Sequence, residues 1–448
     1  MRGLRVNTLK LAPEEFYRIS PFPLGEKIEW CESAFNLLQT PPASKKSPSL
    51  PEPGKHPYHL AGLYYLQDPS AMAAAELLDP QPGERVLDLT AAPGGKTTHL
   101  ASLMRGEGLL IANEIKTKRL NHLVVNVERW GSANLVVTNV TPEQLADHFG
   151  AFFDKVLVDA PCSGEGMFRK DMGARLDWSE QMVTGCAIRQ TNILRVAAHL
   201  VRPGGCLLYS TCTFAPEEDE GVVARFLHEH HDFDVEALPQ LPGFMPGRPD
   251  WLEIPANASS QEPATREILR GAVRLFPHRL KGEGHFACLL RRKPGPGDAL
   301  TDLQSMVKIP APLFKLWQAF QEEILNIEFP HSRLRLHGER LYFIPLELPD
   351  LRGLRITIPG ILLGYFKKDR FEPAHTLAVF LRPGEAKHSL ALGADSPQMA
   401  AYLHGESLPV EGHPGWTVVT VDGWPLGWGK RVQGVVKNHF PRGLQILS

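Results

Sequence analysis

An alternation of short apolar runs and helical stretches between about residues 60 and 293 limits the fold more than any other feature of the chain. Runs rich in β-branched residues that alternate with longer helical stretches are typical of βαβ units. The expected strands are Arg85–Leu89, Leu109–Glu114, Leu135–Asn139, Lys155–Asp159 and Cys206–Ser210. The expected helices are Lys96–Met104, Lys118–Trp130 and Gln181–Val201, with Pro203, Gly204 and Gly205 ending the last one. The pattern predicts an α/β fold around an open parallel sheet.

The flanking segments predict further units, because 448 residues exceed the usual size of one domain. We expect a small N-terminal unit over 1–57, ending in a linker rich in Pro, Ser and Lys at 41–57. The main domain is expected over 58–293, with an antiparallel edge strand near His285–Arg291. After the Pro- and Gly-rich segment 294–297, residues 300–448 are expected to form one or two smaller units with more β character.

Composition excludes several classes of protein. The net charge is −2, so any binding of nucleic acid would need local basic faces. No apolar stretch approaches the roughly 18 residues that span a bilayer, and the first residues lack the apolar core of a signal peptide. We therefore expect a cytoplasmic protein with no membrane partner. Six cysteines without a C-x-x-C pair argue against a metal site and against a disulfide framework.

A glycine-rich loop follows the first expected strand of the main domain. It comprises Ala91, Ala92, Pro93, Gly94, Gly95 and Lys96. Glycines let a backbone pass close to a ligand, and Glu114, at the end of the next strand, is at the distance where an acidic residue holds ribose hydroxyls. A dinucleotide site or a structural turn is the alternative. Because the loop lacks both G-x-G-x-x-G and the phosphate-loop spacing, an adenosine ligand without a pyrophosphate fits better.

Two cysteines, Cys162 and Cys212, each follow an expected strand of the sheet. The carboxyl ends of parallel strands are where ligands bind in open sheets. A thiolate there can add to an electron-poor ring carbon and later leave, so the pair indicates nucleophilic chemistry rather than packing. Asp159 ends the strand before Cys162 and could hydrogen-bond a base, with a turn-capping role as the alternative. The other cysteines are expected in the core or carry no motif: Cys31, Cys186, Cys206 and Cys288.

Three motifs in a fixed order carry a resemblance to a known family. They are Ala91–Thr97, Asp159–Gly166 and Ser210–Thr213, with Gln67–Met72 upstream and Pro277–His278 and Gly284–Phe286 downstream. Together they resemble the Sun/Nop family of RNA cytosine-5 methyltransferases over about residues 60–293. The stretch Arg5–Lys10 resembles the start of that family's N-terminal RNA-binding module. The stretch Gly423–Lys430 is similar to the RsmF type, which modifies 16S ribosomal RNA.

The resemblance implies a Rossmann-like methyltransferase domain flanked by small α+β RNA-binding domains, the last one PUA-like, with S-adenosyl-L-methionine as cofactor. It implies that Cys212 attacks C6 of cytosine and that Cys162 assists release, which the residues alone leave open. It places Lys96 and Arg119 on the cofactor side. Asn139 could meet the adenine, with a turn-forming role as the alternative.

The sequence departs from the family pattern in two places. Family members usually carry a helical segment before the Arg-Val-Asn stretch, whereas this chain begins almost on it, which leaves open a shortened start or a reduced N-terminal module. Thr90 stands where many relatives have Cys or Ala, and a small side chain there should be tolerated.

The expected partner is RNA, either 16S ribosomal RNA or the small ribosomal subunit, with transfer RNA less favoured. Near the end of the chain, basic residues interleave with aromatic ones that could stack on bases: Lys430, Arg431, Lys437 and Arg442, with Trp424, Trp428 and Phe440. Arg169, Lys170 and Asp171 are expected beside the path of the RNA. A catalytically idle RNA-binding assembly factor is one alternative. An amino-group methyltransferase is another, although such enzymes carry Asn-Pro-Pro-aromatic where this chain has Asp-Ala-Pro-Cys.

Overall fold

The structure is a computed structural model that describes residues 2–38, 52–252, 262–295 and 309–445. A four-stranded sheet in the order β2-β3-β1-β4 forms the N-terminal unit. Its elements are β1 (Arg2–Val6), α1 (Pro13–Ile19), β2 (Leu24–Ile28), β3 (Cys31–Leu37), α2 (Pro57–Leu60) and β4 (Tyr64–Gln67). In the part of the chain that is described, no helix combines the length and apolarity that a membrane crossing needs.

A ten-stranded sheet forms the centre of the molecule, in the order β11-β12-β13-β9-β8-β5-β6-β7-β16, with β10 also paired to β13. The expected parallel strands are present as β5 (Arg85–Asp88), β6 (Leu109–Asn113), β7 (Leu135–Thr138), β8 (Phe153–Asp159) and β9 (Val201–Thr211). The antiparallel strands are β10 (Phe233–Glu236), β11 (Phe244–Pro246), β12 (Val273–Leu275), β13 (His285–Arg292) and β16 (Ile356–Ile358).

Helices cover both faces of this sheet, as in doubly wound α/β folds. One buried cluster lies with α3 (Pro69–Leu78), α4 (Gly95–Leu103) and α5 (Thr117–Trp130). The other lies with α6 (Pro142–Phe149), α8 (Glu180–Leu200) and α9 (Glu220–Glu229). The shorter helices are α7 (Met172–Asp177) and α10 (Glu262–Leu269). Two apolar layers therefore hold the strands, and the carboxyl ends of β5 to β9 meet at one edge.

Two expectations about the ends of elements are wrong. The strand His285–Arg292 is not an edge, because β12 pairs with its first half and β10 with its second half. Its first six residues are all buried, as in a central strand. Pro203, Gly204 and Gly205 lie inside β9 rather than in a turn after the helix, because α8 already ends at Leu200. A Cβ at Gly205 would lie 2.8 Å from the Asp154 carbonyl oxygen, so the strand needs glycine there.

Two smaller sheets follow in the C-terminal part. The first, in the order β14-β15-β17-β18, contains β14 (Leu334–His337), β15 (Arg340–Phe343), β17 (Ile361–Phe366) and β18 (Phe371–Pro373), with α11 (Ala311–Ile324) and α12 (His375–Phe380). The second, in the order β19-β21-β22-β23-β20, contains β19 (Ser389–Leu392), β20 (Leu408–Pro409), β21 (Gly415–Val421), β22 (Trp424–Val432) and β23 (Val435–Asn438), with α13 (Pro397–Leu403).

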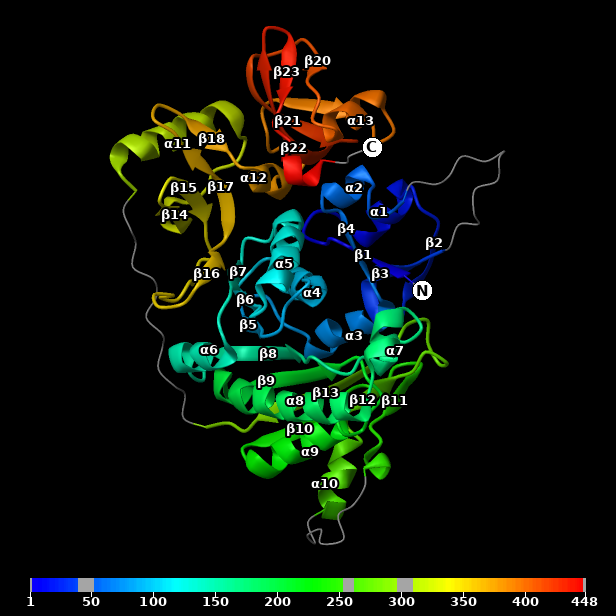
Figure 1. Ribbon diagram of the computed structural model, residues 1–448. Coiled ribbons are helices and arrows are strands. Elements are labelled where there is room, and N and C mark those ends of the chain that lie inside the picture. The colour runs from blue at the N-terminus through cyan, green and yellow to red at the C-terminus, as the bar shows by residue number, and fades with distance from the viewer. Residues whose placement is uncertain (1, 39–51, 253–261, 296–308, 446–448) are drawn as a thin grey trace, which may run out of the picture.

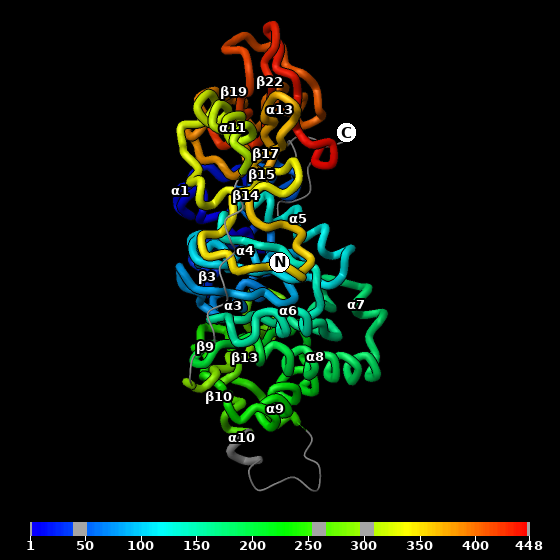
Figure 2. The backbone as a smooth tube through the Cα atoms, turned by 90° about the vertical axis from the view of Figure 1, so that its left-hand side faces the viewer, coloured from blue at the N-terminus to red at the C-terminus, as the bar shows by residue number. Residues whose placement is uncertain are grey.

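The units are joined by more than the linkers. Strand β16, from the C-terminal part, pairs antiparallel with β7 and extends the central sheet. The last unit and the N-terminal unit share one buried cluster, in which Leu4 and Phe16 lie with Tyr402 and Leu426. Figure 1 shows the last unit above the N-terminal unit, and the turned view in Figure 2 shows the same stacking along the length of the molecule.

Candidate functional site

The glycine-rich loop joins β5 to α4 and packs tightly on its neighbours. Gly94 has a φ of 106°, which glycine tolerates and other residues rarely adopt. A Cβ there would lie 3.2 Å from Leu123, and one at Gly95 would lie 3.2 Å from the Gln67 side chain. Among the described contacts, these glycines therefore allow α4 to start close to α5 and β4.

Asp88, at the end of β5, was not singled out from the sequence. Its Oδ2 accepts a hydrogen bond of 2.7 Å from the Thr97 hydroxyl, whereas its Oδ1 is buried without a partner among the described residues. Burial raises the pKa of Asp88 from 3.8 to about 7. The signal for this residue is its place just before the glycine-rich loop.

The expected cofactor residues at the ends of β6 and β7 lie together. Glu114 is 3% exposed, and its carboxylate accepts a hydrogen bond of 2.8 Å from the Lys116 amide and lies 3.5 Å from the Arg119 guanidinium. Arg119 also donates to the Ala92 carbonyl oxygen of the loop. The Asn139 amide group donates to the Glu114 carbonyl oxygen at 2.6 Å. The loop and the next two strand ends are thus tied into one surface.

Cys162 follows β8 and Cys212 follows β9, and their sulfur atoms lie 3.3 Å apart as free thiols. The Cys212 amide also donates to the Cys162 sulfur at 3.4 Å. The contact between the two sulfur atoms raises the pKa of Cys162 and lowers the pKa of Cys212. Cys212 is therefore the sulfur that ionises first, and Cys162 stays a thiol.

Lys96 and Asp159 form an ion pair of 2.6 Å beside the thiols. Burial alone would raise the pKa of Asp159, but the Lys96 ammonium holds it below its usual value. The Ser210 hydroxyl donates to Asp159 Oδ1 at 3.0 Å, and the Thr90 hydroxyl donates to the Asp159 carbonyl oxygen at 2.9 Å. Asp159 is therefore an oriented carboxylate at neutral pH, and Thr90 links the ends of β5 and β8.

Two further groups at the site were not assigned from the sequence. Buried His285 lies with Nδ1 3.4 Å from the Ser70 hydroxyl, which donates to Asp68 at 2.6 Å. Glu218 is fully buried beside the segments that carry the two thiols. The sequence hides Glu218 because it lies in a run of four acidic residues, which usually marks a solvated turn.

Several residues expected to meet RNA are held by the protein. Arg169 donates to Glu283 at 3.1 Å and to the Gly282 carbonyl oxygen at 2.8 Å, and Asp171 caps α7. Trp428 and Phe440 are 1% and 4% exposed, so neither is a stacking platform, because both fill the C-terminal core. Buried Arg431 donates to the His413 carbonyl oxygen, whereas the basic residues Lys170, Lys437 and Arg442 are exposed.

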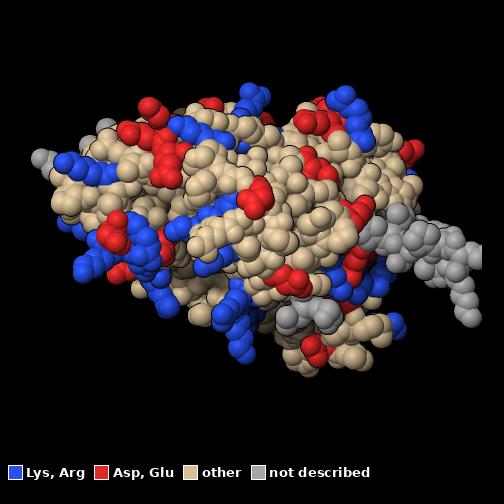
Figure 3. All heavy atoms as spheres, turned by 90° about the horizontal axis from the view of Figure 1, so that it is seen from above, with Lys and Arg blue, Asp and Glu red and all other residues tan. Residues whose placement is uncertain are grey.

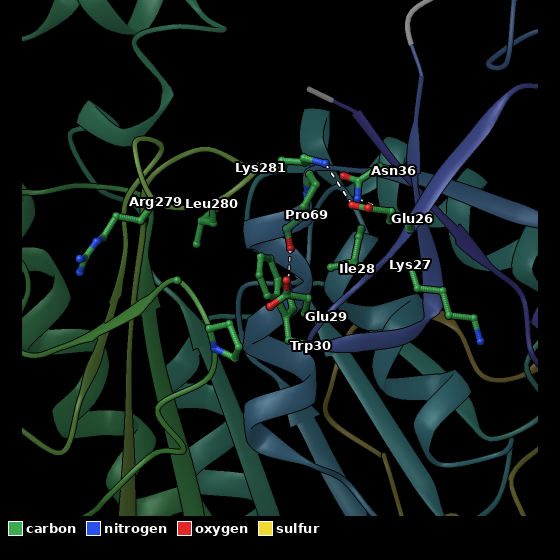
Figure 4. A pocket seen from close by; sticks show the side chains of 12 residues that line it. Glu26, Lys27, Ile28, Glu29, Trp30, Asn36, Pro69, Arg279, Leu280 and Lys281 are labelled. Carbon is green, nitrogen blue, oxygen red and sulfur yellow. Dashed lines mark hydrogen bonds and ion pairs between the residues drawn. The ribbon is translucent and has the colours of Figure 1, made fainter.

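A pocket of about 220 Å³ lies between the β2–β3 turn and the loop at 279–281 (Figure 4). The Trp30 indole N–H donates to the Pro69 carbonyl oxygen at 2.9 Å, and Lys281 lies 3.3 Å from Glu26. A Cβ at Gly282 would lie 3.0 Å from the Ser70 amide nitrogen, so this loop abuts the start of α3. The N-terminal unit therefore leaves a hollow next to the segment that holds Arg169.

One group among the described residues combines three kinds of metal-binding donor. The donor atoms of Cys31, Glu76 and His99 lie within 4.8 Å of one another. His99 Nε2 lies 2.9 Å from Glu76 and 3.6 Å from the Cys31 sulfur, so the three side chains already serve one another as hydrogen-bond partners.

Comparison with known families accounts for most of the chain. The 16S rRNA methyltransferase RsmB/F family matches residues 75–291. The N-terminal domain of 16S rRNA methyltransferase RsmF matches residues 1–69, the RsmF first C-terminal domain matches 319–381, and the RsmF PUA domain matches 389–446.

Curated relatives match along the whole length. Ribosomal RNA small subunit methyltransferase F of Shigella boydii serotype 18 is 31% identical over 468 residues, covering 99% of this chain and 90% of the relative. Its counterpart in Vibrio parahaemolyticus is 30% identical, with 99% and 91% covered.

Solved structures share the central fold. A methyltransferase homologue from Pyrococcus horikoshii has a TM-score of 0.53 and 30% identity, covering 65% of this chain and 86% of the other. NSun6 from the same organism has a TM-score of 0.52 at 21% identity, with 65% and 91% covered, which shows the fold alone. With a full-length relative at 31% identity and all four regions matched, the chain belongs to the ribosomal RNA small subunit methyltransferase F family.

Proposed function

We propose that this protein transfers a methyl group from S-adenosylmethionine to C5 of cytosine in 16S ribosomal RNA, through a covalent bond between Cys212 and C6 of the base. The contact of 3.3 Å between the Cys162 and Cys212 sulfur atoms carries this proposal. It supplies an ionisable nucleophile with a proton donor beside it at the ligand-binding edge of the sheet. The 16S RNA substrate is taken from the names of the curated relatives.

S-adenosylmethionine would supply a methyl group carried on a positively charged sulfur. The residues at the ends of β5, β6 and β7 fit such a ligand. Asp88 Oδ1 is a buried acceptor without a partner among the described residues, and Glu114 offers a buried carboxylate where ribose hydroxyls bind in such folds. Arg119 holds Glu114 and the loop carbonyl of Ala92 in place, and Asn139 closes the same edge.

Cytosine C5 is a poor nucleophile, so the protein must first activate the ring. The Cys212 thiolate adds to C6, which breaks the aromatic system and makes C5 electron-rich. Asp159, oriented by Lys96 and Ser210, accepts a hydrogen bond from the exocyclic amine or a protonated N3 and offsets the developing charge. C5 then bonds to the methyl carbon while the bond from that carbon to the cofactor sulfur breaks and leaves its electron pair on the cofactor sulfur. A water molecule entering the site takes the C5 proton, the C5–H electron pair forms the C5–C6 double bond, and the C6–S bond breaks with its electron pair returning to Cys212.

The target base must leave any stack before a buried thiolate can reach C6. Figure 3 shows basic and acidic side chains interspersed over one face, in keeping with the net charge of −2. RNA contacts are therefore assigned to single exposed cations such as Lys170, Lys437 and Arg442. The alternative of an idle assembly factor is disfavoured because both thiols and the Lys96–Asp159 pair are present.

The nucleophile is tested with Cys212→Ala, for which we expect complete loss of methyl transfer because the remaining thiol, Cys162, keeps its proton and does not add to C6. Bisulfite sequencing of 16S RNA after incubation with each protein measures the product. Cys206→Ala is the matched control, since Cys206 lies on β9 six residues before Cys212. Turnover by Cys212→Ala would refute the assignment, and a modified base other than 5-methylcytosine would refute the reaction.

The second thiol is tested with Cys162→Ala. We expect this variant to form the Cys212–C6 bond but to resolve it slowly, because the leaving thiolate loses its hydrogen-bond donor. A covalent protein–RNA complex should then survive denaturing electrophoresis in the presence of cofactor. The double variant Cys162→Ala/Cys212→Ala should show none. Normal turnover without a trapped complex would make Cys162 a lining residue.

A further inference from the structure

Glu218 lies between the two segments that carry the thiols. Its side chain is fully buried, and its Oε2 accepts hydrogen bonds from the Ser163 amide at 3.0 Å and from the Gln190 side chain at 2.8 Å. Its Oε1 accepts from the Thr213 hydroxyl at 3.3 Å. Ser163 directly follows Cys162, and Thr213 directly follows Cys212. One carboxylate therefore bonds the neighbour of each cysteine.

The surrounding hydrogen bonds close this arrangement. The Ser163 and Thr213 hydroxyl groups lie 2.9 Å apart, and Gln190 also donates to the Pro161 carbonyl oxygen at 3.0 Å. The Gly166 amide donates to the Cys212 carbonyl oxygen at 2.9 Å. Because the loops after β8 and β9 are joined in this way, the separation of the two sulfur atoms depends on groups that bind Glu218.

The charge of Glu218 acts on the sulfur atoms of both Cys162 and Cys212. A cation, Lys96, acts on Cys212 alone. No Lys or Arg of the described residues forms an ion pair with Glu218. Its carboxylate raises the pKa of Cys162 after the larger effects of the Cys212 contact and burial. At Cys212 the Cys162 contact lowers the pKa and burial raises it; Asp159 and Glu218 also raise it, and the Lys96 ammonium lowers it. The other titratable groups that it faces are Cys186, Tyr209 and Asp219.

We propose that Glu218 is a positioning residue that holds the two thiols in contact and keeps the proton on Cys162, so that Cys212 is the attacking sulfur. Burial raises the pKa of Glu218, and the three hydrogen bonds donated to its oxygens oppose that shift. Its catalytic consequence rests on the proposed function, whereas its effect on the two thiols does not. Glu218 touches no reacting atom and acts only through Cys162 and Cys212.

The first experiment compares the rates at which iodoacetamide alkylates Cys162 and Cys212 in the full-length protein across pH, with mass spectrometry to assign each site. In the unmodified protein Cys212 should react first. Glu218→Gln keeps an acceptor but removes the charge, so we expect the preference for Cys212 to fall about tenfold, as for a change of one pKa unit. Glu217→Gln is the matched control, since this neighbour is exposed. An unchanged preference in Glu218→Gln would overturn the electrostatic role.

The second experiment tests the holding role with Glu218→Ala, which leaves the Ser163 amide and the Thr213 hydroxyl without their acceptor. We expect kcat to fall about 100-fold, the scale for a misplacement of about 1 Å, with KM for RNA little changed. Glu218→Gln should restore most of the activity. If Glu218→Ala fails to fold, the role of Glu218 is still tested by comparing kcat for Glu218→Gln with kcat for Glu217→Gln. Equal kcat values with unchanged alkylation would overturn the proposal.

The two experiments also separate this proposal from the proposed function. Alkylation needs neither RNA nor cofactor, so it reports on Glu218 even if cytosine is not the substrate. If Cys212→Ala abolishes methylation while Glu218 variants alkylate and turn over normally, only the role of Glu218 fails. If no 5-methylcytosine forms but the preference for Cys212 falls in Glu218→Gln, only the reaction assignment fails.

Discussion

Three carboxyl groups at neighbouring strand ends have different surroundings, and the pKa values of two of them, Asp159 and Asp88, move in opposite directions. Asp159 is ionised beside Lys96, and Glu114 lies next to Arg119. Asp88 has no cation in contact and an unpartnered Oδ1 among the described residues, so burial dominates and raises its pKa to about 7. Groups whose environments push their pKa values apart commonly mark acid, base and binding roles in one site. In the proposed reaction, Asp159 would face the base and Asp88 and Glu114 the cofactor.

Asp88 makes the stability of the protein depend on pH. Burial raises its pKa from 3.8 to about 7, so its contribution to stability is fully present below pH 3.8 and is lost as pH rises through about 7. Asp88→Asn mimics the protonated carboxyl, so it should keep this contribution to stability as pH rises. Without cofactor, we expect the free energy of unfolding of the variant to rise relative to that of the unmodified protein by roughly 1.4 kcal/mol for each pH unit between pH 3.8 and about 7. Thermal unfolding across pH measures this. The exposed Asp177→Asn is the control, and parallel profiles would contradict the shift.

At the scale of elements, the strands with strong local signals were predicted and the short ones were not. Runs such as Leu109–Asn113, buried at every position, give an unambiguous signal, and their carboxyl ends place the thiols and Glu114 correctly. Strands β11, β12 and β16 have three residues each, too few for any periodicity. β12 and β16 form on the edges of the longer strands β13 and β7, and β11 pairs with β12. The sequence predicts Trp428 at the surface, whereas it is buried, because a local run of basic residues does not reveal which side of β22 faces the core.

The pairing of β16 with β7 gives an element-scale prediction. Leu351 is 5% exposed and lies in the central core. The Arg355 carbonyl oxygen accepts a hydrogen bond of 3.0 Å from the backbone amide of Asn139, and His148 Nε2 contacts the Asp350 carbonyl oxygen. Leu351→Asp should detach β16, because an unpaired carboxylate cannot remain buried there. We expect hydrogen exchange across residues 135–139 to quicken at least about tenfold.

Leu346→Asp is the matched control for this prediction, since Leu346 is 70% exposed five residues before Leu351. It should leave exchange in β7 unchanged. Slow exchange in both variants would show that β16 stays paired without the Leu351 contact. In that case the hydrogen bonds of the strand, rather than its apolar anchor, would hold the C-terminal part on the sheet.

At the scale of the whole molecule, the two ends of the chain stabilise each other. The Tyr58 hydroxyl donates to Asp422 at 2.9 Å, and one apolar cluster contains residues of both the N-terminal unit and the last unit. Sequence patterns cannot reveal such contacts, because each partner shows only its own local periodicity. The N-terminal unit is therefore packed between the last unit and the catalytic sheet, which makes it a structural support of the site as well as an RNA-binding candidate.

Arg5 provides the whole-molecule test of this support. Strand β1 of the N-terminal unit carries it, and its buried guanidinium donates to the Thr98 hydroxyl at 2.7 Å and to the Gly95 carbonyl oxygen at 3.1 Å, in the first turns of the helix that carries Lys96. Its charged centre also lies 4.6 Å from the Trp130 ring. Hydrogen bonds from a charged donor contribute about 1.5–3 kcal/mol each. Arg5→Met should therefore lower the melting temperature. Because the start of α4 would be held less firmly, the affinity for cofactor measured by calorimetry should also fall roughly tenfold. Arg2→Met, at an exposed position, should change neither property. If Arg5→Met melts at a lower temperature but binds cofactor normally, the N-terminal unit supports the fold without supporting the site. If both properties are unchanged, it supports neither.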